Sequence, residues 1–309
     1  MIDIQKIETF LCAAENSSLS EAAKRLHLSQ PTVSHQVKVL EQELGVTLFV
    51  RSSTGLQLTE AGRLLVPWAR RLLHDTNDLK DMMTSLQGEI AGELRISCST
   101  TPGKYVLPQM AARFCLQYRG IKVRILACGP ERAALDLLGG EAHIAVVSSE
   151  VSDSSLESQR FFQDTISMIV PARHRWAVRA SVEPHEILEE PVLLREETSG
   201  TRRVVLAELA KFDISLDDLN IFMELGNAEA IVRTVAAGYG ISFVSTLATA
   251  CPSERENVVD IPVEGLNLKR TIYMVRKRIT APHRPRDVFW SFIHDPANAD
   301  LIRMAEHQI

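Results

Sequence analysis

Apolar side chains recur at helical spacing in the first part of the chain. Within SLSEAAKRLHLSQPTVSHQVKVLEQELG, residues 18–45, Ser18 precedes Glu21 by three positions. That spacing is a capping box, so a helix is expected to begin at residue 19. Its apolar face would consist of Ala22, Ala23 and Leu26.

A second helix is expected to begin at Gln30, after a tight turn. Ser29 is a suitable N-cap, and Pro31 falls in the first turn, where its missing N–H would be unpaired in any case. Apolar residues recur along it at spacings of three and four, and its other faces are polar: the apolar positions are Val33, Val37, Leu40 and Leu44. The pair is typical of a helix-turn-helix, whose second helix enters the DNA major groove. An ordinary αα-hairpin in a helical domain is the alternative.

The segments after this helix pair favour the helix-turn-helix. TLFVR and LQL are short β-prone segments separated by the turn SSTG, and Thr59 can cap a new helix. They predict a two-stranded wing that carries Arg51, a side chain suited to phosphate or minor-groove contact.

A heptad repeat of leucine begins at Leu58. Ala61, Trp68 and Met82 occupy the companion position, and Pro67 lies inside the pattern. A sustained heptad indicates a coiled-coil seam, here in a linker helix over 58–88; a single amphipathic helix packed on its own domain is the alternative. The candidate dimerisation residues are Leu58, Leu65, Trp68, Leu72, Leu79 and Leu86.

Beyond residue 90, apolar runs alternate with helical segments. This alternation predicts an α/β fold with mostly parallel strands, which binds ligands at the carboxyl ends of the strands. The expected strands are 93–97, 122–128, 143–147, 165–170, 192–195, 221–224, 241–245 and 270–275.

Short polar residues follow three of these runs, where helices are expected to begin. Free N–H groups at a helix start attract anions, and a cation in the first turn, such as Arg202, opposes the helix dipole unless an anion is near. These residues are either plain N-caps or together a small-anion site. The candidate effector-binding residues are Ser99, Thr100, Thr101, Thr198, Ser199, Gly200, Thr201, Arg202 and Asn227.

Composition and charge narrow the class of protein. The chain has 309 residues, 45% of them hydrophobic and 24% charged, which suits two or three packed domains. No run approaches the roughly 18 apolar residues of a membrane span, so we expect a cytoplasmic protein without a membrane partner. The net charge is −5, and residues 1–65 contain six Lys or Arg against seven Asp or Glu. DNA binding must therefore depend on local placement of charge, such as Lys38 on the leading half of the second helix.

The histidines and the searched sequence motifs give little support to an enzymatic function. The nine histidines show no HExxH-like spacing, and there is no GxSxG, P-loop or dinucleotide fingerprint. We expect no catalytic site, no metal and no cofactor. The five cysteines occur singly, as in a reducing compartment. Cys98 and Cys128 each end an expected strand, so redox or soft-metal sensing is a rival to anion sensing. A small-molecule-binding protein or enzyme would leave residues 1–88 without a purpose.

Residues 1–65 resemble the winged helix-turn-helix of LysR-type transcriptional regulators, through LSQPTVSHQVKVLEQELGVTLFVRSSTGLQLTEAG, and the resemblance extends over the whole chain. It implies that Gln30, Pro31, Ser34 and residue 35 face bases, and that Arg51 and Thr59 contact the DNA backbone. His35 replaces the arginine common in the family and lacks its bidentate fork. The candidate DNA-binding set is Gln30, Pro31, Thr32, Ser34, His35, Lys38, Arg51 and Thr59.

The same resemblance implies a fold class and partners. The expected architecture is an all-α winged helix-turn-helix domain at 1–65, a dimerising linker helix at 58–88, and an α/β effector domain at 91–309 that resembles a periplasmic binding protein. Its lobe one would be 91–162 plus 267–309, and its lobe two 163–266, with the effector between them. The implied partners are double-stranded operator DNA, a small effector (an organic acid or inorganic anion), further copies in a homodimer or homotetramer, and RNA polymerase.

Overall fold

The computed structural model describes residues 2–52, 55–85, 90–151, 153–250, 257–278 and 282–306. The chain divides into two compact units, Met1–Gly92 with Leu138–Glu141, and Glu93–Leu137 with Ala142–Ile309. Each unit is described by itself.

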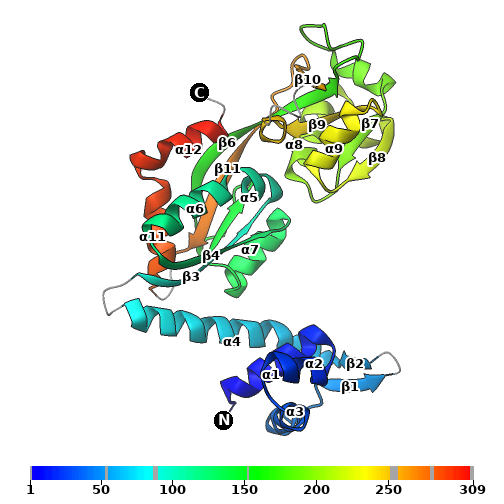
Figure 1. Cartoon of the computed structure of the whole chain (residues 1–309). Helices are drawn as coiled ribbons and strands as arrows, with labels where there is room; N and C mark the ends of the chain where they lie inside the picture. The colour runs from blue at the N-terminus through cyan, green and yellow to red at the C-terminus, as the bar shows by residue number, and fades with distance from the viewer. Residues whose placement is uncertain are drawn as a thin grey trace. The chain divides into compact units, whose positions relative to one another are not determined.

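The N-terminal unit is helical with a two-stranded hairpin (Figure 1). Its elements are α1 (Ile4–Asn16), α2 (Leu19–Arg25), α3 (Gln30–Leu44), β1 (Phe49–Ser52), β2 (Gly55–Leu58) and α4 (Glu60–Ser85). Ser18 Oγ accepts the N–H of Glu21, and Ser29 Oγ accepts the N–H of Thr32, so both expected N-caps are present. Helix α3 ends at Leu44, and the next residue, Gly45, has a φ of 70°, a left-handed conformation that glycine adopts without strain.

In the N-terminal unit a small apolar cluster packs α2 against α1 and α3 through Ala13, Ala22, Ala23 and Val33, and a second cluster forms the main core. Helices α1, α3 and α4 contribute to it, and β1 and β2 add partly buried side chains at its edge. The fully or nearly fully buried members are Ile7, Phe10, Leu11, Leu40, Leu48 and Ala69. Because α3 buries Val33, Val37 and Leu40, its opposite face is left to solvent.

Helix α4 begins at Glu60, two residues later than the heptad suggests. Leu58 lies in β2, where it pairs with Phe49 and packs against the core of the unit, so the seam prediction is wrong for this residue. Leu65 is on α4 but also packs against that core. Packing against the core of their own domain removes apolar surface of both leucines from water, which stabilises the fold. The heptad spacing alone does not reveal this packing. Leu86 lies outside the described residues.

The C-terminal unit is an α/β domain. Its strands are β3 (Ala91–Cys98), β4 (Gly120–Ala127), β5 (Ile144–Val147), β6 (Leu156–Pro171), β7 (Val192–Arg195), β8 (Ile221–Leu225), β9 (Ile241–Ser245), β10 (Val258–Ile261) and β11 (Lys269–Lys277). Its α-helices are α5 (Thr100–Tyr105), α6 (Leu107–Gln117), α7 (Pro130–Gly139), α8 (Gly200–Leu209), α9 (Ala228–Ala236), α11 (Arg284–Ile293) and α12 (Ala299–Ala305). Short 3-10 helices are η1 (Pro184–Glu189), η2 (Ala210–Phe212), η3 (Leu216–Asp218), η4 (Thr246–Thr249) and η5 (Pro296–Asn298).

The strands follow the order β4-β3-β5-β11-β6-β9-β7-β8, with β10 also paired to β6. Figure 1 shows β6 and β11 passing from the part of the unit that holds α5, α6 and α11 to the part that holds α8 and α9. Below, these parts are called lobe one, built on β3, β4 and β5, and lobe two, built on β7, β8 and β9.

The expectation of mostly parallel strands is wrong for the described pairs. β3 with β5, and β7 with both β8 and β9, are parallel. β11 with both β5 and β6, and β6 with both β9 and β10, are antiparallel. The reason is that β6 leaves lobe one for lobe two while β11 returns in the opposite direction, and direct antiparallel pairing needs no helical crossover.

Candidate functional site

The leading half of α3 presents a polar face. Gln30, Pro31, Thr32, His35 and Lys38 are exposed, whereas Ser34 is half-buried. No acidic residue lies in the first turn of α3. The face therefore offers donors, acceptors and one lysine with no carboxylate among the first-turn residues, as a DNA-reading surface requires.

The wing next to α3 is a short antiparallel hairpin. Arg51 pairs with Leu56 across it, and the description of Arg51 covers its backbone only. Thr59 Oγ1 donates to Thr47 O at 2.7 Å and accepts the N–H of Gly62 at 3.0 Å. The hydroxyl thus caps α4 and ties it to the segment before β1. A phosphate contact by Arg51 or Thr59 stays a prediction.

A row of apolar side chains on α4 is exposed to solvent. Trp68 is 63% exposed, Leu72 39% and Leu79 53%, and all three belong to the predicted seam. Leu64 and Met83, adjacent to the predicted positions 65 and 82, are exposed as well. A row of exposed large apolar residues on one helix is a feature of contact surfaces.

A small cavity that is partly open to solvent lies in the C-terminal unit, where the start of α5 from lobe one meets the start of α8 from lobe two. Seven of the nine candidate effector-binding residues line it, namely Ser99, Thr100, Thr101, Thr198, Ser199, Gly200 and Thr201. Further lining residues outside that candidate set are Cys128, which the rival redox hypothesis names, and Gly129, Arg195, Glu196 and Arg270. The prediction from residues that follow strand ends therefore identified most of the lining residues but missed Arg195 and Arg270.

Arg202 and Asn227 are not among the described residues that line this cavity. Asn227 Oδ1 accepts the N–H groups of Glu229 and Ala230 and so caps α9. Arg202 Nη1 donates to Glu224 Oε2 at 2.6 Å and to the carbonyl of Arg195 at 3.0 Å. The anion that balances Arg202 in the first turn of α8 is thus a carboxylate of the protein itself.

The start of α8 is capped from within the cavity. Ser199 Oγ accepts the N–H of Thr201 at 3.2 Å and approaches that of Arg202 at 3.5 Å. Ser199 and Thr201 are buried, whereas Thr198 is exposed. Ser99 donates its hydroxyl to the carbonyl of Val146 at 3.2 Å rather than capping α5. In the lining of the cavity, the hydroxyl of Ser99 thus acts as a donor and that of Ser199 as an acceptor.

Both arginines of the cavity are buried and hold carboxylates. Arg195 Nε and Nη2 donate to the two oxygens of Glu196 at 2.7 and 2.8 Å. Arg270 Nε donates to Asp164 Oδ2 at 2.8 Å, and Asp164 is fully buried. Arg195 is the last residue of β7 and Arg270 the second residue of β11, and neither position indicates a binding role in the sequence.

The two cysteines of the rival redox hypothesis lie on neighbouring strands. The N–H of Cys128 donates to the carbonyl of Cys98 at 2.7 Å. Burial, with a smaller contribution from Cys128, raises the pKa of the Cys98 thiol to about 12. Burial and then the charge of Asp136 also raise the pKa of Cys128. Both groups are therefore protonated thiols at neutral pH, and the thiol is the unreactive form.

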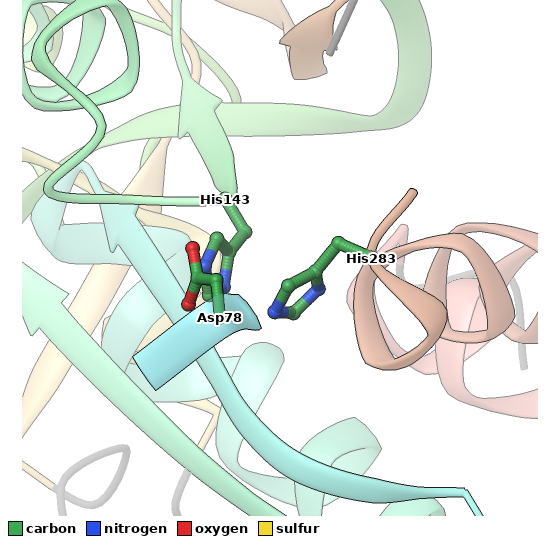
Figure 2. Close-up of side chains that lie close together, drawn as sticks. All are labelled: Asp78, His143 and His283. Atoms are coloured by element: carbon green, nitrogen blue, oxygen red, sulfur yellow. The ribbon is translucent and has the colours of Figure 1, made fainter. Parts of the chain in front are cut away.

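Two histidines that are far apart in the sequence come together in the C-terminal unit (Figure 2). The ring centroids of His143 and His283 are 3.8 Å apart. The backbone N–H of Arg95 donates to His143 Nδ1 at 3.1 Å, and that of Arg286 donates to His283 Nδ1 at 3.1 Å. The third labelled residue, Asp78, belongs to the N-terminal unit. Both described rings thus have one nitrogen engaged by backbone N–H groups.

None of the helices in the described part of the chain has the length and apolar character needed to cross a membrane.

Two family models together match most of the chain. Residues 4–63 match the family described as bacterial regulatory helix-turn-helix protein, lysR family, and residues 87–297 match the LysR substrate binding domain. An uncharacterised helix-turn-helix transcriptional regulator of Methanocaldococcus jannaschii is 32% identical over 94% of this chain and 98% of that protein. A probable RuBisCO transcriptional regulator of Nostoc sp. is 28% identical over 99% of this chain and 93% of that protein. The crystal structure of full-length CbnR complexed with its target DNA has a TM-score of 0.74 and 22% identity, and the match covers 95% of this chain and 99% of that one.

Proposed function

Since this chain belongs to the LysR family of DNA-binding transcriptional regulators, we propose that it binds its operator as a homo-oligomer and that a small anion in the cavity between α5 and α8 alters that binding. The relatives are named as transcriptional regulators and not as enzymes. The DNA-binding part of the proposal uses the polar face of α3 and the adjacent wing.

The observation that supports an anion is the wall of the cavity. Hydroxyl side chains from both lobes line it, together with the start of α8, a ten-residue helix whose N-terminal end carries partial positive charge. A large apolar effector would be favoured by an apolar lining, and the described lining has none of the large aliphatic or aromatic residues. The ligand that suits this wall is a small organic acid or an inorganic anion.

The two lobes give such a ligand a way to act. α5 starts from lobe one and α8 from lobe two, so an anion that contacts both favours the arrangement in which the two helix starts are close. A ligand shifts an equilibrium only through such a difference in affinity between two arrangements. The exposed row on α4 supports pairing of two chains, which places two reading heads on one operator.

Redox sensing by Cys98 and Cys128 is the second candidate mechanism. The pKa values of both thiols are raised, which favours the anion proposal over one that needs a reactive thiolate.

A thermal-shift screen tests the effector class. Inorganic phosphate, sulfate and small carboxylates should raise the melting temperature, because a ligand bound only by the folded state stabilises it, whereas neutral aromatics should not. Thr100→Val removes one lining hydroxyl and should raise the ligand concentration needed by about tenfold. Thr234→Val, at a half-buried threonine of α9 outside the cavity lining, is the matched control. Stabilisation only by neutral compounds, unaffected by Thr100→Val, would contradict the anion site.

DNA binding is tested separately. The full chain should be retained on operator-like DNA, and deletion of residues 1–65 should abolish retention without changing the thermal shift produced by the anion. Retention of the truncated chain would contradict the assignment of DNA binding to α3 and the wing.

A further inference from the structure

The proposed effector site holds a buried cation that no sequence signal had placed there. We propose that Arg270 is the residue that makes this site selective for an oxyanion, a carboxylate, phosphate or sulfate group, and that Asp164 positions it. The proposal rests on the proposed function, because it concerns the same cavity.

Arg270 is held in one orientation. It lies directly opposite Asp164 in the register of β11 and β6. Its Nε and Nη2 both lie within 2.8 Å of Asp164 Oδ2, and Nη2 also donates to Thr101 Oγ1 at 3.0 Å. The other oxygen of Asp164 accepts the hydroxyl of Ser245 at 2.5 Å. The guanidinium is therefore held by Asp164 of β6 and Thr101 of lobe one, and Ser245 of lobe two holds Asp164 in turn.

The remaining edge of the guanidinium faces the start of α8. A Cβ added at Gly200, the first residue of α8, would lie 3.0 Å from Arg270 Nη1 and 2.3 Å from Ser148 Oγ, so both side chains approach this helix start. The described hydrogen bonds and ion pairs of Arg270 use Nε and Nη2, and none uses Nη1. A cation beside a helix start is unfavourable, since both carry positive charge. An oxyanion in the cavity that accepts hydrogen bonds from both would offset this repulsion.

Arg195 is a poorer partner for such an anion. Its carboxylate, Glu196, lines the cavity beside it, so the ligand would meet a negative charge together with the positive one. Asp164, which neutralises Arg270, has no exposed surface and is not part of the described lining. Arg270 thus presents its cationic edge to the cavity while its counter-charge lies behind it.

The alternative is that Arg270 only neutralises the buried Asp164 and does not contact a ligand. The two roles predict different behaviour of one variant. Arg270→Lys keeps a positive charge next to Asp164 but lacks the second terminal nitrogen that faces Gly200. If the arginine only balances Asp164, this variant binds anions as the wild type does. If Nη1 contacts the ligand, affinity falls although the charge is kept.

The experiment is isothermal titration with inorganic phosphate, sulfate and glycolate, with glycolamide as the neutral counterpart of glycolate. The wild type should bind at least one of the three oxyanions and discriminate against glycolamide. Arg270→Lys should weaken oxyanion binding by at least about tenfold and reduce the preference for glycolate over glycolamide. Arg276→Lys, on the same strand but paired with Glu157 away from the cavity, should leave both unchanged.

Each result separates the two proposals. Wild-type binding that Arg270→Lys leaves intact overturns the role of Arg270, while the anion site itself stands. Absence of binding to all three oxyanions in the wild type overturns the anion effector and this inference with it. If Arg270→Lys does not fold, the double variant Asp164→Asn with Arg270→Gln removes both charges together and should lose oxyanion binding to the same extent; retained binding then overturns the role of Arg270.

Discussion

Glu41 Oε1 accepts the backbone N–H of Leu48 at 2.7 Å, and this contact joins helix α3 to the start of the wing. The same oxygen accepts the N–H of Phe49 at 3.2 Å. Leu48 is almost fully buried, so its N–H cannot turn to water if the carboxylate is removed. One acid at the far end of α3 therefore fixes the wing relative to the helix that we propose to face DNA.

Glu41→Ala should loosen the wing. Loss of a hydrogen bond to a charged acceptor, with a buried donor left unpaired, costs about 1–3 kcal/mol. Hydrogen exchange at Leu48 and Phe49 should accelerate accordingly, and operator affinity should fall. Glu43→Ala is the control, because Glu43 pairs with Lys6 at the surface and such pairs contribute about 0–1 kcal/mol. Unchanged protection at Leu48 in Glu41→Ala would refute the coupling.

Gln30→Ala and Ser34→Ala should each weaken operator binding by about 1–3 kcal/mol, while binding to random DNA stays nearly the same. Both residues lie on the leading half of α3, where a side chain that reads base edges must lie. Fluorescence anisotropy with operator and scrambled duplexes measures the two affinities. Gln42→Ala, at an exposed position of the trailing half, serves as control. An equal loss on both duplexes would move these residues from the bases to the phosphates.

Local sequence signals predicted the elements of the fold well. Ser18 and Ser29 located the starts of α2 and α3 because a side-chain cap acts within three residues. The apolar runs located most strands, and β7 begins and ends where the run VLLR does. These signals need no knowledge of the rest of the chain.

The predictions that were wrong or missing concern contacts between segments that are distant in the sequence. Leu58 fitted the heptad, yet pairing with Phe49 placed it in a strand. Asp164 and Arg270 are 106 residues apart, and each looks like an ordinary charged residue at a strand until β6 and β11 are paired. Arg202 suggested a bound anion, but Glu224, 22 residues away, supplies the negative charge. No spacing rule reveals such partners.

Cys98 should resist alkylation in the folded protein. Its pKa of about 12, against an ordinary value of 9.0, lowers the thiolate fraction at pH 7.5 by about a thousandfold. A folded-state pKa above the unfolded value stabilises the fold fully below pH 9.0, and this contribution is lost as the pH rises toward 12. Mass spectrometry after iodoacetamide treatment should find Cys98 labelled in urea and unlabelled in buffer. Rapid labelling of Cys98 in buffer would revive the redox hypothesis.

Leu72→Asp should separate the chains if the exposed row on α4 is a dimer contact. Leu72 lies in that row between Trp68 and Leu79, so a carboxylate there would face its own copy in a paired helix. Dissociation should lower operator affinity by about a hundredfold or more, because a separated chain loses the effect of linking two DNA-binding domains. Analytical ultracentrifugation over a range of concentrations measures the assembly. Asn77→Asp introduces the same charge at an exposed polar position of α4 and should leave assembly intact. If Leu72→Asp sediments as the wild type does, the row on α4 is not the contact that joins the chains, and the pairing of reading heads must be sought on another surface.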